Sequence, residues 1–401
     1  MLFRSGQAMV GFFQARSHRV AAFRGCPIQA APAEACAEAL RDFLAAGGPG
    51  PWDPRSGRGF LRTMTVRSAF SSGEVMVILS AASKKLPRWE ELADRLDQAV
   101  ADLPPRENAP DWRLTGLFLE PFQARAGRFR TEIQPGKLIR LDGSRVLRET
   151  VGEAVYDVSP QAFWQVNPVM TESLYEKIFE YAQLAPGSEV LDLYCGVGAI
   201  GLYLARRVGG ALRLTGIEVN EQAVVNANRN AVLNGIVDAR FGAGRAEEVL
   251  PGLVERKKAA GTDDHAAGAG AGAGTEPGAG NTTVSAGANS RPEGSADLSA
   301  SDAAAGDGAF DPETGFDTGL QVGHPQVVVL DPPRAGCREE LLRAAAAADP
   351  ARIVYVSCEP ATMARDIRLL SGYGYAFVRA CPVDMFPHSG RVECVALLLR
   401  E

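Results

Sequence analysis

The sequence of 401 residues lacks any run of about twenty apolar residues, so it predicts no membrane-spanning helix. Its first residues show no charged segment followed by an apolar stretch and a cleavage site, and therefore indicate no secretory signal. The seven cysteines are scattered without a paired framework, which is typical of a reducing compartment. We therefore expect a cytoplasmic protein that has no membrane partner.

The chain also lacks the clustered ligands of a metal centre. Cys26 stands in the tetrapeptide R-G-C-P, and no C-x-x-C partner lies near it. Neither a zinc site nor an iron–sulfur site can be built from a single cysteine. The sequence therefore predicts no metal site made from the residues that are present.

A surplus of basic residues is missing as well, because the formal net charge is −6. The acidity is concentrated in residues 255–325, which hold eleven acidic and four basic residues, so the rest of the chain is close to neutral. Residues 1–75 hold nine arginines and five acidic residues. Six arginines there are candidates for phosphate contacts, although a solvated face explains each one equally well: Arg16, Arg19, Arg24, Arg58, Arg62 and Arg67. This charge distribution permits RNA binding without demonstrating it.

The length and the local patterns indicate two domains. Residues 1–156 mix strands and helices, with a hairpin expected over 60–66 and 75–79, an amphipathic helix over 89–100 and further strands over 114–119 and 137–141. We interpret them as a smaller α+β domain for RNA binding, and residues 157–401 as the second domain. Residues 255–325 contain almost no large apolar side chains, and we expect a disordered insert there. Because residues 9–13 are already strand-like, we also expect that an N-terminal piece is missing.

The centre of the second domain is the stretch 189–205, which reads E-V-L-D-L-Y-C-G-V-G-A-I-G-L-Y-L-A. An apolar run that meets three glycines and resumes at helical spacing predicts a buried parallel strand that turns sharply into a helix. Gly196, Gly198 and Gly201 match G-x-G-x-x-G, a string that dinucleotide-binding folds share. The form D-x-Y-C-G-x-G also resembles motif I of S-adenosylmethionine (SAM) methyltransferases. A structural turn without a ligand is the third interpretation.

Several polar side chains come directly after expected strands. Glu218 ends the strand over 214–218, and an acid in this position is expected to bind ribose hydroxyls. Asp331 opens D-P-P-R-A-G after the strand over 326–330, and Cys358 stands in S-C-E-P-A-T after the strand over 352–356. Because ligands bind at the carboxyl ends of parallel strands, one cleft can hold these residues together with Tyr194.

The segment 157–168, D-V-S-P-Q-A-F-W-Q-V-N-P, precedes a helix over 171–183 and combines aromatic rings with amides. Such side chains suit stacking on a nucleobase and reading of its edge. As a bare pattern, the same segment would more often belong to a core.

Taken together, D-P-P-R-x-G, Y-x-S-C-x-P-x-T and D-x-F-P-H-S-x-x-V-E resemble motifs of the RNA uracil-C5 methyltransferase family, from Asp157 to the C-terminus apart from the insert. The resemblance implies a Rossmann-like α/β fold with a seven-stranded sheet, SAM as cofactor and RNA as substrate. The surroundings of Cys26 resemble the last ligand of a 4Fe-4S cluster in the ribosomal-RNA branch. The other three cysteines and the family's small TRAM/OB-like barrel are not in this sequence.

The resemblance also implies residue roles. Cys358 is the nucleophile that adds to uracil C6, and Glu393 removes the C5 proton. The implied SAM-binding residues are Gln165, Tyr194, Gly196, Gly198, Glu218 and Asp331. Phe163 would help to place the base, which has to leave its stack, and Arg334 and Arg365 would contact phosphate or structure their loop.

We therefore expect a monomeric SAM-dependent enzyme that makes 5-methyluridine, in ribosomal RNA in preference to transfer RNA. A transfer-RNA enzyme is the near alternative. A non-catalytic paralogue that binds SAM and RNA is the alternative from another class, motivated by Ala199 and Arg245, where the family commonly has a polar residue and an aspartate. An amino-methyltransferase fits less well, because such sites resemble N/D-P-P-Y and need no cysteine.

Overall fold

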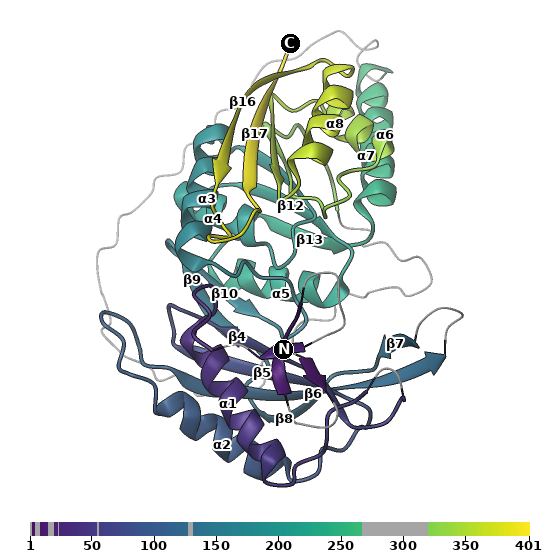
Figure 1. The fold of residues 1–401 in the computed structure, drawn as a ribbon. Coiled ribbons are helices and arrows are strands. Elements are labelled where there is room, and N and C mark those ends of the chain that lie inside the picture. Colours follow the sequence, from purple (N-terminus) through teal and green to yellow (C-terminus); the bar gives the residue numbers. More distant parts are fainter. Residues whose placement is uncertain are drawn as a thin grey trace, which may run out of the picture.

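The computed structural model describes residues 2–4, 9–14, 20–22, 24–53, 56–126, 131–266 and 320–401. These residues form two units, each built on its own sheet, with the N-terminal unit below the C-terminal unit in Figure 1. Within the described ranges, no helix has both the length and the apolar character that crossing a membrane requires. The two arginines Arg16 and Arg19 lie outside the described residues.

The N-terminal unit contains an eight-stranded sheet in the order β3-β2-β1-β4-β5-β6-β7, with β8 paired to β6. Its strands are β1 (Leu2–Arg4), β2 (Met9–Phe13), β3 (Val20–Ala22), β4 (Leu61–Ser68), β5 (Glu74–Ala81), β6 (Arg113–Ala126), β7 (Thr131–Pro135) and β8 (Ile139–Gly143). Helices α1 (Ala31–Ala45) and α2 (Trp89–Ala101) bury leucines such as Leu40 and Leu92 in a common core with the sheet. The hairpin and the amphipathic helix expected from the sequence are therefore present.

A hairpin of β9 (Leu147–Val151) and β10 (Ala154–Val158) connects the two units. Tyr156 is fully buried in the core of the C-terminal unit. The amide oxygens of Asn230 and Asn234 accept the backbone N–H groups of Asp157 and Val155 at 2.8 and 2.9 Å. The domain boundary expected after residue 156 thus falls inside a hairpin that packs on the C-terminal unit.

The C-terminal unit contains a seven-stranded sheet in the order β13-β12-β11-β14-β15-β17-β16, as expected. Its strands are β11 (Glu189–Leu193), β12 (Arg213–Glu218), β13 (Ala239–Ala243), β14 (Val327–Leu330), β15 (Arg352–Ser357), β16 (Tyr375–Val383) and β17 (Glu393–Arg400). Strands β11, β12, β13, β14 and β15 are parallel to one another. Strand β17 runs antiparallel to both of its neighbours, β15 and β16. Near-continuous apolar runs such as V-V-V-L in β14 are what a sheet covered on both faces requires.

Helices cover both faces of this sheet. One face packs against α3 (Pro168–Ala182), α4 (Ala199–Arg207) and α5 (Glu221–Leu233), and the other against α6 (Ala246–Ala266), α7 (Glu339–Ala347) and α8 (Pro360–Ser371). This doubly wound α/β arrangement leaves the carboxyl ends of the parallel strands open to a ligand.

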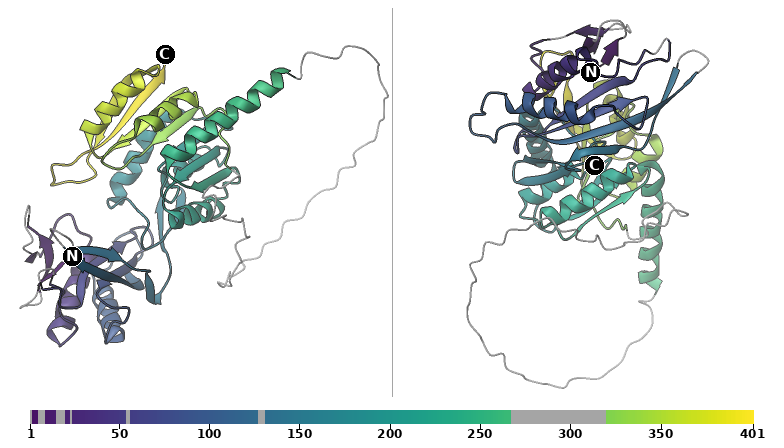
Figure 2. Two further views of the ribbon diagram at one scale, coloured as in Figure 1. Left: turned by 90° about the vertical axis from the view of Figure 1, so that its right-hand side faces the viewer. Right: turned by 90° about the horizontal axis from the view of Figure 1, so that it is seen from below.

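Ordered structure extends into both ends of the insert that the sequence predicted over residues 255–325. Helix α6 continues to Ala266 and extends away from the sheet in Figure 2. At the other end, Leu320 and Val322 are buried in the same core as α6. The carboxylate of Glu189 accepts backbone N–H groups from Gly323 and His324 at 2.7 and 3.2 Å, which fixes the return of the chain. The remainder of the expected insert, residues 267–319, lies outside the described residues.

Candidate active site

The glycine loop between β11 and α4 leaves space for a ligand at one glycine only. A Cβ added to Gly196, which has φ of 57°, would meet nothing within 4 Å. At Gly198 the same atom would lie 2.9 Å from the ring of Phe241, and at Gly201 it would lie 2.9 Å from Asp192 Oδ2. Gly198 and Gly201 therefore permit close packing, while the backbone at Gly196 is open to a cofactor.

Two acidic side chains accept hydrogen bonds from the backbone of this loop. Glu218, at the end of β12, accepts the N–H groups of Gly196 at 3.0 Å and Asn220 at 2.8 Å. Asp192, which is fully buried in β11, accepts the N–H of Gly201 at 3.0 Å through Oδ2. Its Oδ1 is buried and has no hydrogen-bond partner among the described residues. Asp192 is thus a fully buried carboxyl group beneath the loop, and it does not line the pocket at the carboxyl edge of the sheet.

The four residues expected at one edge of the sheet lie at the ends of neighbouring strands, but only Tyr194 and Asp331 line the pocket found there. Tyr194 follows β11, Glu218 ends β12, Asp331 follows β14 and Cys358 follows β15, and these four strands are consecutive in the sheet. A small pocket at this edge is lined by Phe163, Trp164, Gln165, Tyr175, Tyr194, Cys195, Gly196, Val197, Ala199, Ile200 and Asp331. Five of the predicted site residues therefore line a single pocket.

Tyr194 adopts an unusual backbone conformation, with φ of 63°. Its hydroxyl donates a 2.9 Å hydrogen bond to the Glu247 carboxylate at the start of α6. Helix α6 therefore holds the side chain of Tyr194, and the backbone of Tyr194 turns the loop toward Gly196. The role of Glu247 could not be read from the sequence, since an acid in the first turn of a helix is a common capping feature.

Cys358 and Glu393 lie at the ends of two neighbouring antiparallel strands. Cys358 directly follows β15, Glu393 is the first residue of β17, and the last registered pair of these strands is Ser357 with Cys394. Cys358 is half-buried and immediately precedes Glu359, the N-cap of α8. Glu393 is 4% exposed.

Three carboxyl groups near this edge have raised pKa values. Burial and, to a smaller extent, the nearby charge of Asp331 together raise the pKa of Glu393 to about 8. Burial also raises the pKa of Asp331 and that of Asp192 to about 7 each. Desolvation disfavours each carboxylate, so the cluster holds protons near neutral pH until a cation enters.

The two predicted RNA-contacting arginines differ in their surroundings. Arg334 is exposed, and its backbone carbonyl accepts the hydroxyl of Thr362 at 3.2 Å. The guanidinium of Arg365 donates to the Asp366 carboxylate at 2.7 Å and to the carbonyls of Ala335 and Cys337 at 3.0 and 3.2 Å. These contacts favour the second interpretation of Arg365, in which it structures the D-P-P-R-A-G loop.

The segment before α3 links the pocket to the C-terminal turn. Phe163 is 68% exposed, so its ring is available to a substrate. Asn167 caps α3 by accepting the N–H of Met170 at 3.3 Å, and its amide donates to the carbonyl of Met385 at 3.3 Å. An asparagine followed by a proline at the first helical position is a capping signal. The sequence alone could therefore have identified Asn167 as the N-cap of this helix.

Cys26 is half-buried in the loop before α1. Among the described residues, no group of three or more His, Cys, Asp or Glu side chains could hold a metal ion. Cys26 therefore has no partners among the described residues with which to ligate an iron–sulfur cluster.

A doubly wound sheet with an open glycine loop, an acid at the end of the second strand and a pocket at the carboxyl edge is an arrangement that dinucleotide-binding folds and SAM-dependent methyltransferases share, and the family comparisons assign this chain to the methyltransferases. Residues 184–259 match a family model described as a methyltransferase domain, and residues 302–401 match the tRNA (uracil-5-)-methyltransferase model.

Known proteins resemble nearly the whole chain. An RNA methyltransferase of Oceanobacillus iheyensis is 30% identical over 98% of this chain and 68% of its own length, and one of Enterococcus faecalis is 32% identical over the same shares. The tRNA (uracil-54, C5)-methyltransferase of Pyrococcus abyssi in complex with S-adenosyl-L-homocysteine has the same fold, with a TM-score of 0.62 and 23% identity over 96% of this chain and 72% of that chain. The chain belongs to the RNA uracil-C5 methyltransferase family, and its cofactor is SAM.

Proposed function

We propose that the protein transfers a methyl group from SAM to C5 of a uridine in RNA through a covalent bond between Cys358 and C6 of the base. The observation that carries this proposal is a shared edge of the sheet: Cys358 directly follows β15, Glu393 begins the adjacent strand β17, and Asp331, whose charge acts on Glu393, lines the pocket there. A nucleophile and a proton acceptor within one site are what methylation of a weakly nucleophilic carbon needs.

The proposed reaction uses each residue once. Addition of the Cys358 thiolate to C6 turns the uracil ring into an enolate whose C5 is nucleophilic. Bound SAM would supply the electrophilic methyl group: as C5 bonds to the methyl carbon, the bond from that carbon to the sulfonium sulfur would break and S-adenosylhomocysteine would leave. Glu393 then accepts the proton from C5, and elimination breaks the sulfur–C6 bond, which releases 5-methyluridine and restores the thiolate. Phe163 helps to hold the base outside its stack.

The cofactor would be held by the residues that the sequence indicated. Glu218 is suited to the ribose hydroxyls, and Gly196 allows the backbone to approach the cofactor closely, while Gly198 lets the loop pack against Phe241. Gln165, Tyr194 and Asp331 line the pocket beside this loop. The buried carboxylates of Asp331 and Asp192 provide negative charge for the sulfonium cation.

We infer that the substrate is ribosomal RNA, with the 23S molecule as the target, and that the protein acts as a cytoplasmic monomer. The context of Cys26, with its resemblance to the ribosomal-RNA branch, supports this choice over transfer RNA. The names of the matched family model and of the Pyrococcus abyssi enzyme favour transfer RNA as the second candidate.

The direct test measures the transfer of labelled methyl from SAM to unmodified ribosomal and transfer RNA, together with trapping on RNA that contains 5-fluorouridine. Fluorine at C5 cannot leave as a proton, so a covalent complex should persist on a denaturing gel. An adduct with ribosomal RNA that requires Cys358 would support the proposal. Binding of SAM without transfer or adduct would instead favour a non-catalytic RNA-binding protein.

The raised pKa values of the carboxyl cluster predict that SAM binding depends on pH. Asp331 and Glu393 are protonated at pH 6, and they lose their protons as the pH rises through about 7 and about 8. The sulfonium cation should therefore bind more tightly at pH 8.5 than at pH 6, by about threefold or more. Titration calorimetry with the neutral product S-adenosylhomocysteine and with Asp331→Asn provides the controls. Equal pH profiles for both ligands would contradict the prediction.

A further inference from the structure

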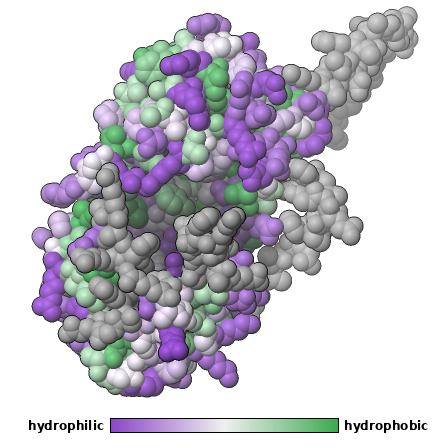
Figure 3. All heavy atoms as spheres, turned by 45° about the vertical axis from the view of Figure 1, so that its right-hand side comes forward, coloured by the Kyte–Doolittle hydropathy of each residue, from purple (hydrophilic) through white to green (hydrophobic). Residues whose placement is uncertain are grey.

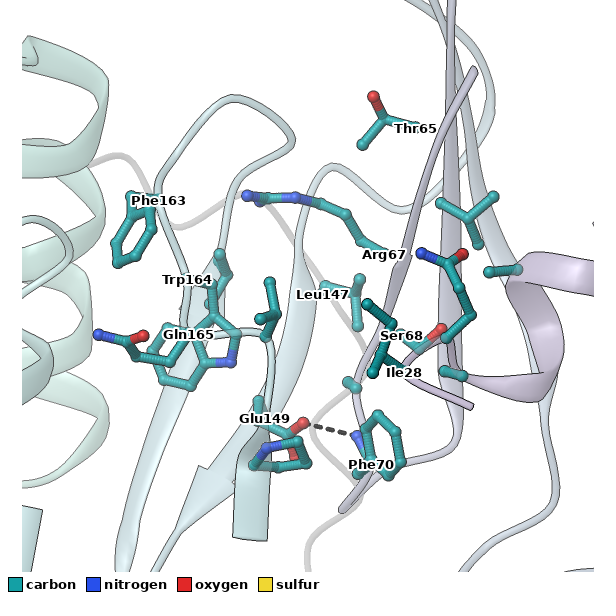
Figure 4. A pocket seen from close by; sticks show the side chains of 18 residues that line it. Ile28, Thr65, Arg67, Ser68, Phe70, Leu147, Glu149, Phe163, Trp164 and Gln165 are labelled. Atoms are coloured by element: carbon teal, nitrogen blue, oxygen red, sulfur yellow. Dashed lines mark hydrogen bonds between the residues drawn. The ribbon is translucent and has the colours of Figure 1, made fainter. Parts of the chain in front are cut away.

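A second pocket of about 350 Å³ lies beside the proposed active site, between the N-terminal sheet and the segment that carries Phe163 (Figure 4). It is lined by parts of the loop before α1, of β4 and β9 and of the segment before α3: Ile28, Gln29, Ala30, Ala33, Thr65, Val66, Arg67, Ser68, Ala69, Phe70, Leu147, Glu149, Val158, Phe163, Trp164, Gln165, Val166 and Pro168. Phe163, Trp164 and Gln165 also line the pocket beside the glycine loop. The two pockets therefore share one wall.

The rim of this pocket is unusually apolar for an exposed surface. Ile28, Phe163 and Val166 are 59%, 68% and 72% exposed. In the space-filling view of Figure 3, the surface is hollowed between the two units, and apolar residues gather around this hollow. Large apolar side chains that remain exposed around a pocket indicate a surface that a ligand covers.

The interior carries a positive charge that no carboxylate neutralises. Arg67 extends from β4 toward the segment before α3 (Figure 4), and its guanidinium donates to the carbonyls of Ser159, at 2.9 Å, and Ala162. Two of its five N–H donors are thus used. Within the described residues Arg67 forms no ion pair, and the Glu149 carboxylate in the same wall is held by the backbone N–H groups of Phe70 and Ser71.

We propose that this pocket binds an unpaired nucleotide of the RNA that neighbours the target uridine, a proposal that rests on the proposed function. Its volume suits one nucleotide, aromatic and aliphatic walls suit the faces of a base, and the amides of Gln29 and Gln165 suit its edge. Arg67 supplies charge for the phosphate. A nucleotide held here, across the ring of Phe163, directs the next one toward the cofactor pocket.

The test blocks the pocket through a residue that does not itself line the cofactor pocket. Ala30 lines the pocket and has an extended backbone with φ of −65°, so Ala30→Trp places an indole there without backbone strain. Its matched control is Ala46→Trp at the exposed C-terminal end of the same helix. Binding is measured by fluorescence anisotropy at fixed salt, in the presence of S-adenosylhomocysteine, with a labelled 12-nucleotide RNA that has one central uridine among adenosines.

We expect Ala30→Trp to weaken RNA binding by about tenfold or more, since stacking of one base has an effect of this size. Ala46→Trp should bind as the unmodified protein does. A second variant, Ile28→Ser, alters only the exposed rim and should weaken binding by about threefold. Unchanged S-adenosylhomocysteine binding establishes that each variant is folded.

Two results would separate the pocket from the reaction. If the unmodified protein methylates RNA but neither Ala30→Trp nor Ile28→Ser weakens binding of the 12-nucleotide RNA, the pocket proposal is wrong and the proposed function stands. If both variants weaken binding but no methyl transfer or 5-fluorouridine adduct is found, the pocket proposal stands and the proposed reaction fails.

Discussion

Replacement of Cys358 by alanine is expected to abolish methyl transfer to RNA while the protein keeps its affinity for SAM and RNA. Without the thiolate, C6 has no nucleophile and C5 does not become reactive toward the methyl group, so we expect the rate to fall by about 10⁴-fold or more. The half-buried Cys358 side chain follows β15 and lies outside the buried strand core, so its loss should affect folding little. Labelled methyl transfer in a single turnover measures the effect.

Cys381→Ala is the matched control for this prediction. Cys381 is also free and half-buried, and it lies on β16, two strands from β15 in the sheet order. It should methylate RNA and form the 5-fluorouridine adduct as the unmodified protein does. Methyl transfer that survives in Cys358→Ala, or an adduct that forms without this cysteine, would overturn the assignment of the nucleophile.

The strand ends could be predicted because each follows a strong local signal. Val327–Leu330 is a short apolar run that stops at D-P-P, and Glu189–Leu193 stops at a glycine loop. Parallel strands expose their carboxyl ends at one edge, so the meeting of Asp331 with the loop follows from the topology alone. The number of seven strands, in contrast, was expected from the family resemblance and not from these local signals.

Contacts between distant segments could not be predicted in this way. Arg67 looks like any surface arginine in the sequence, yet it donates to carbonyls more than ninety residues away, beyond the reach of any local pattern. Glu247 likewise accepts a hydrogen bond from Tyr194, and Asn167 donates one to the carbonyl of Met385. Both partners are distant in the sequence, so no local pattern indicates either contact. The pocket between the two units was missed because its walls come from four separate segments.

Replacement of Glu393 by glutamine is expected to trap a methylated covalent complex with ordinary uridine RNA. The proposed order of steps places methyl transfer before proton removal, so loss of the base should stop the reaction after the methyl group has been transferred. Turnover should fall by about 10²- to 10⁴-fold, while the first methyl transfer remains fast. A denaturing gel that resolves the protein–RNA complex, with methyl-labelled SAM, measures both quantities.

The control for this variant is Glu359→Gln, which changes the acid directly after Cys358. Glu359 caps α8 without a side-chain hydrogen bond, so its loss should leave turnover close to normal.

The raised pKa of Glu393, about 8, adds a second readout. Its carboxylate can accept the C5 proton only when deprotonated, so release of the adduct in the unmodified protein should accelerate as the pH rises toward 8. In Glu393→Gln this dependence should disappear. Each of the two variants, Glu393→Gln and Glu359→Gln, removes one proton acceptor and keeps the nucleophile Cys358. If the covalent complex accumulates in Glu359→Gln and not in Glu393→Gln, the base is Glu359.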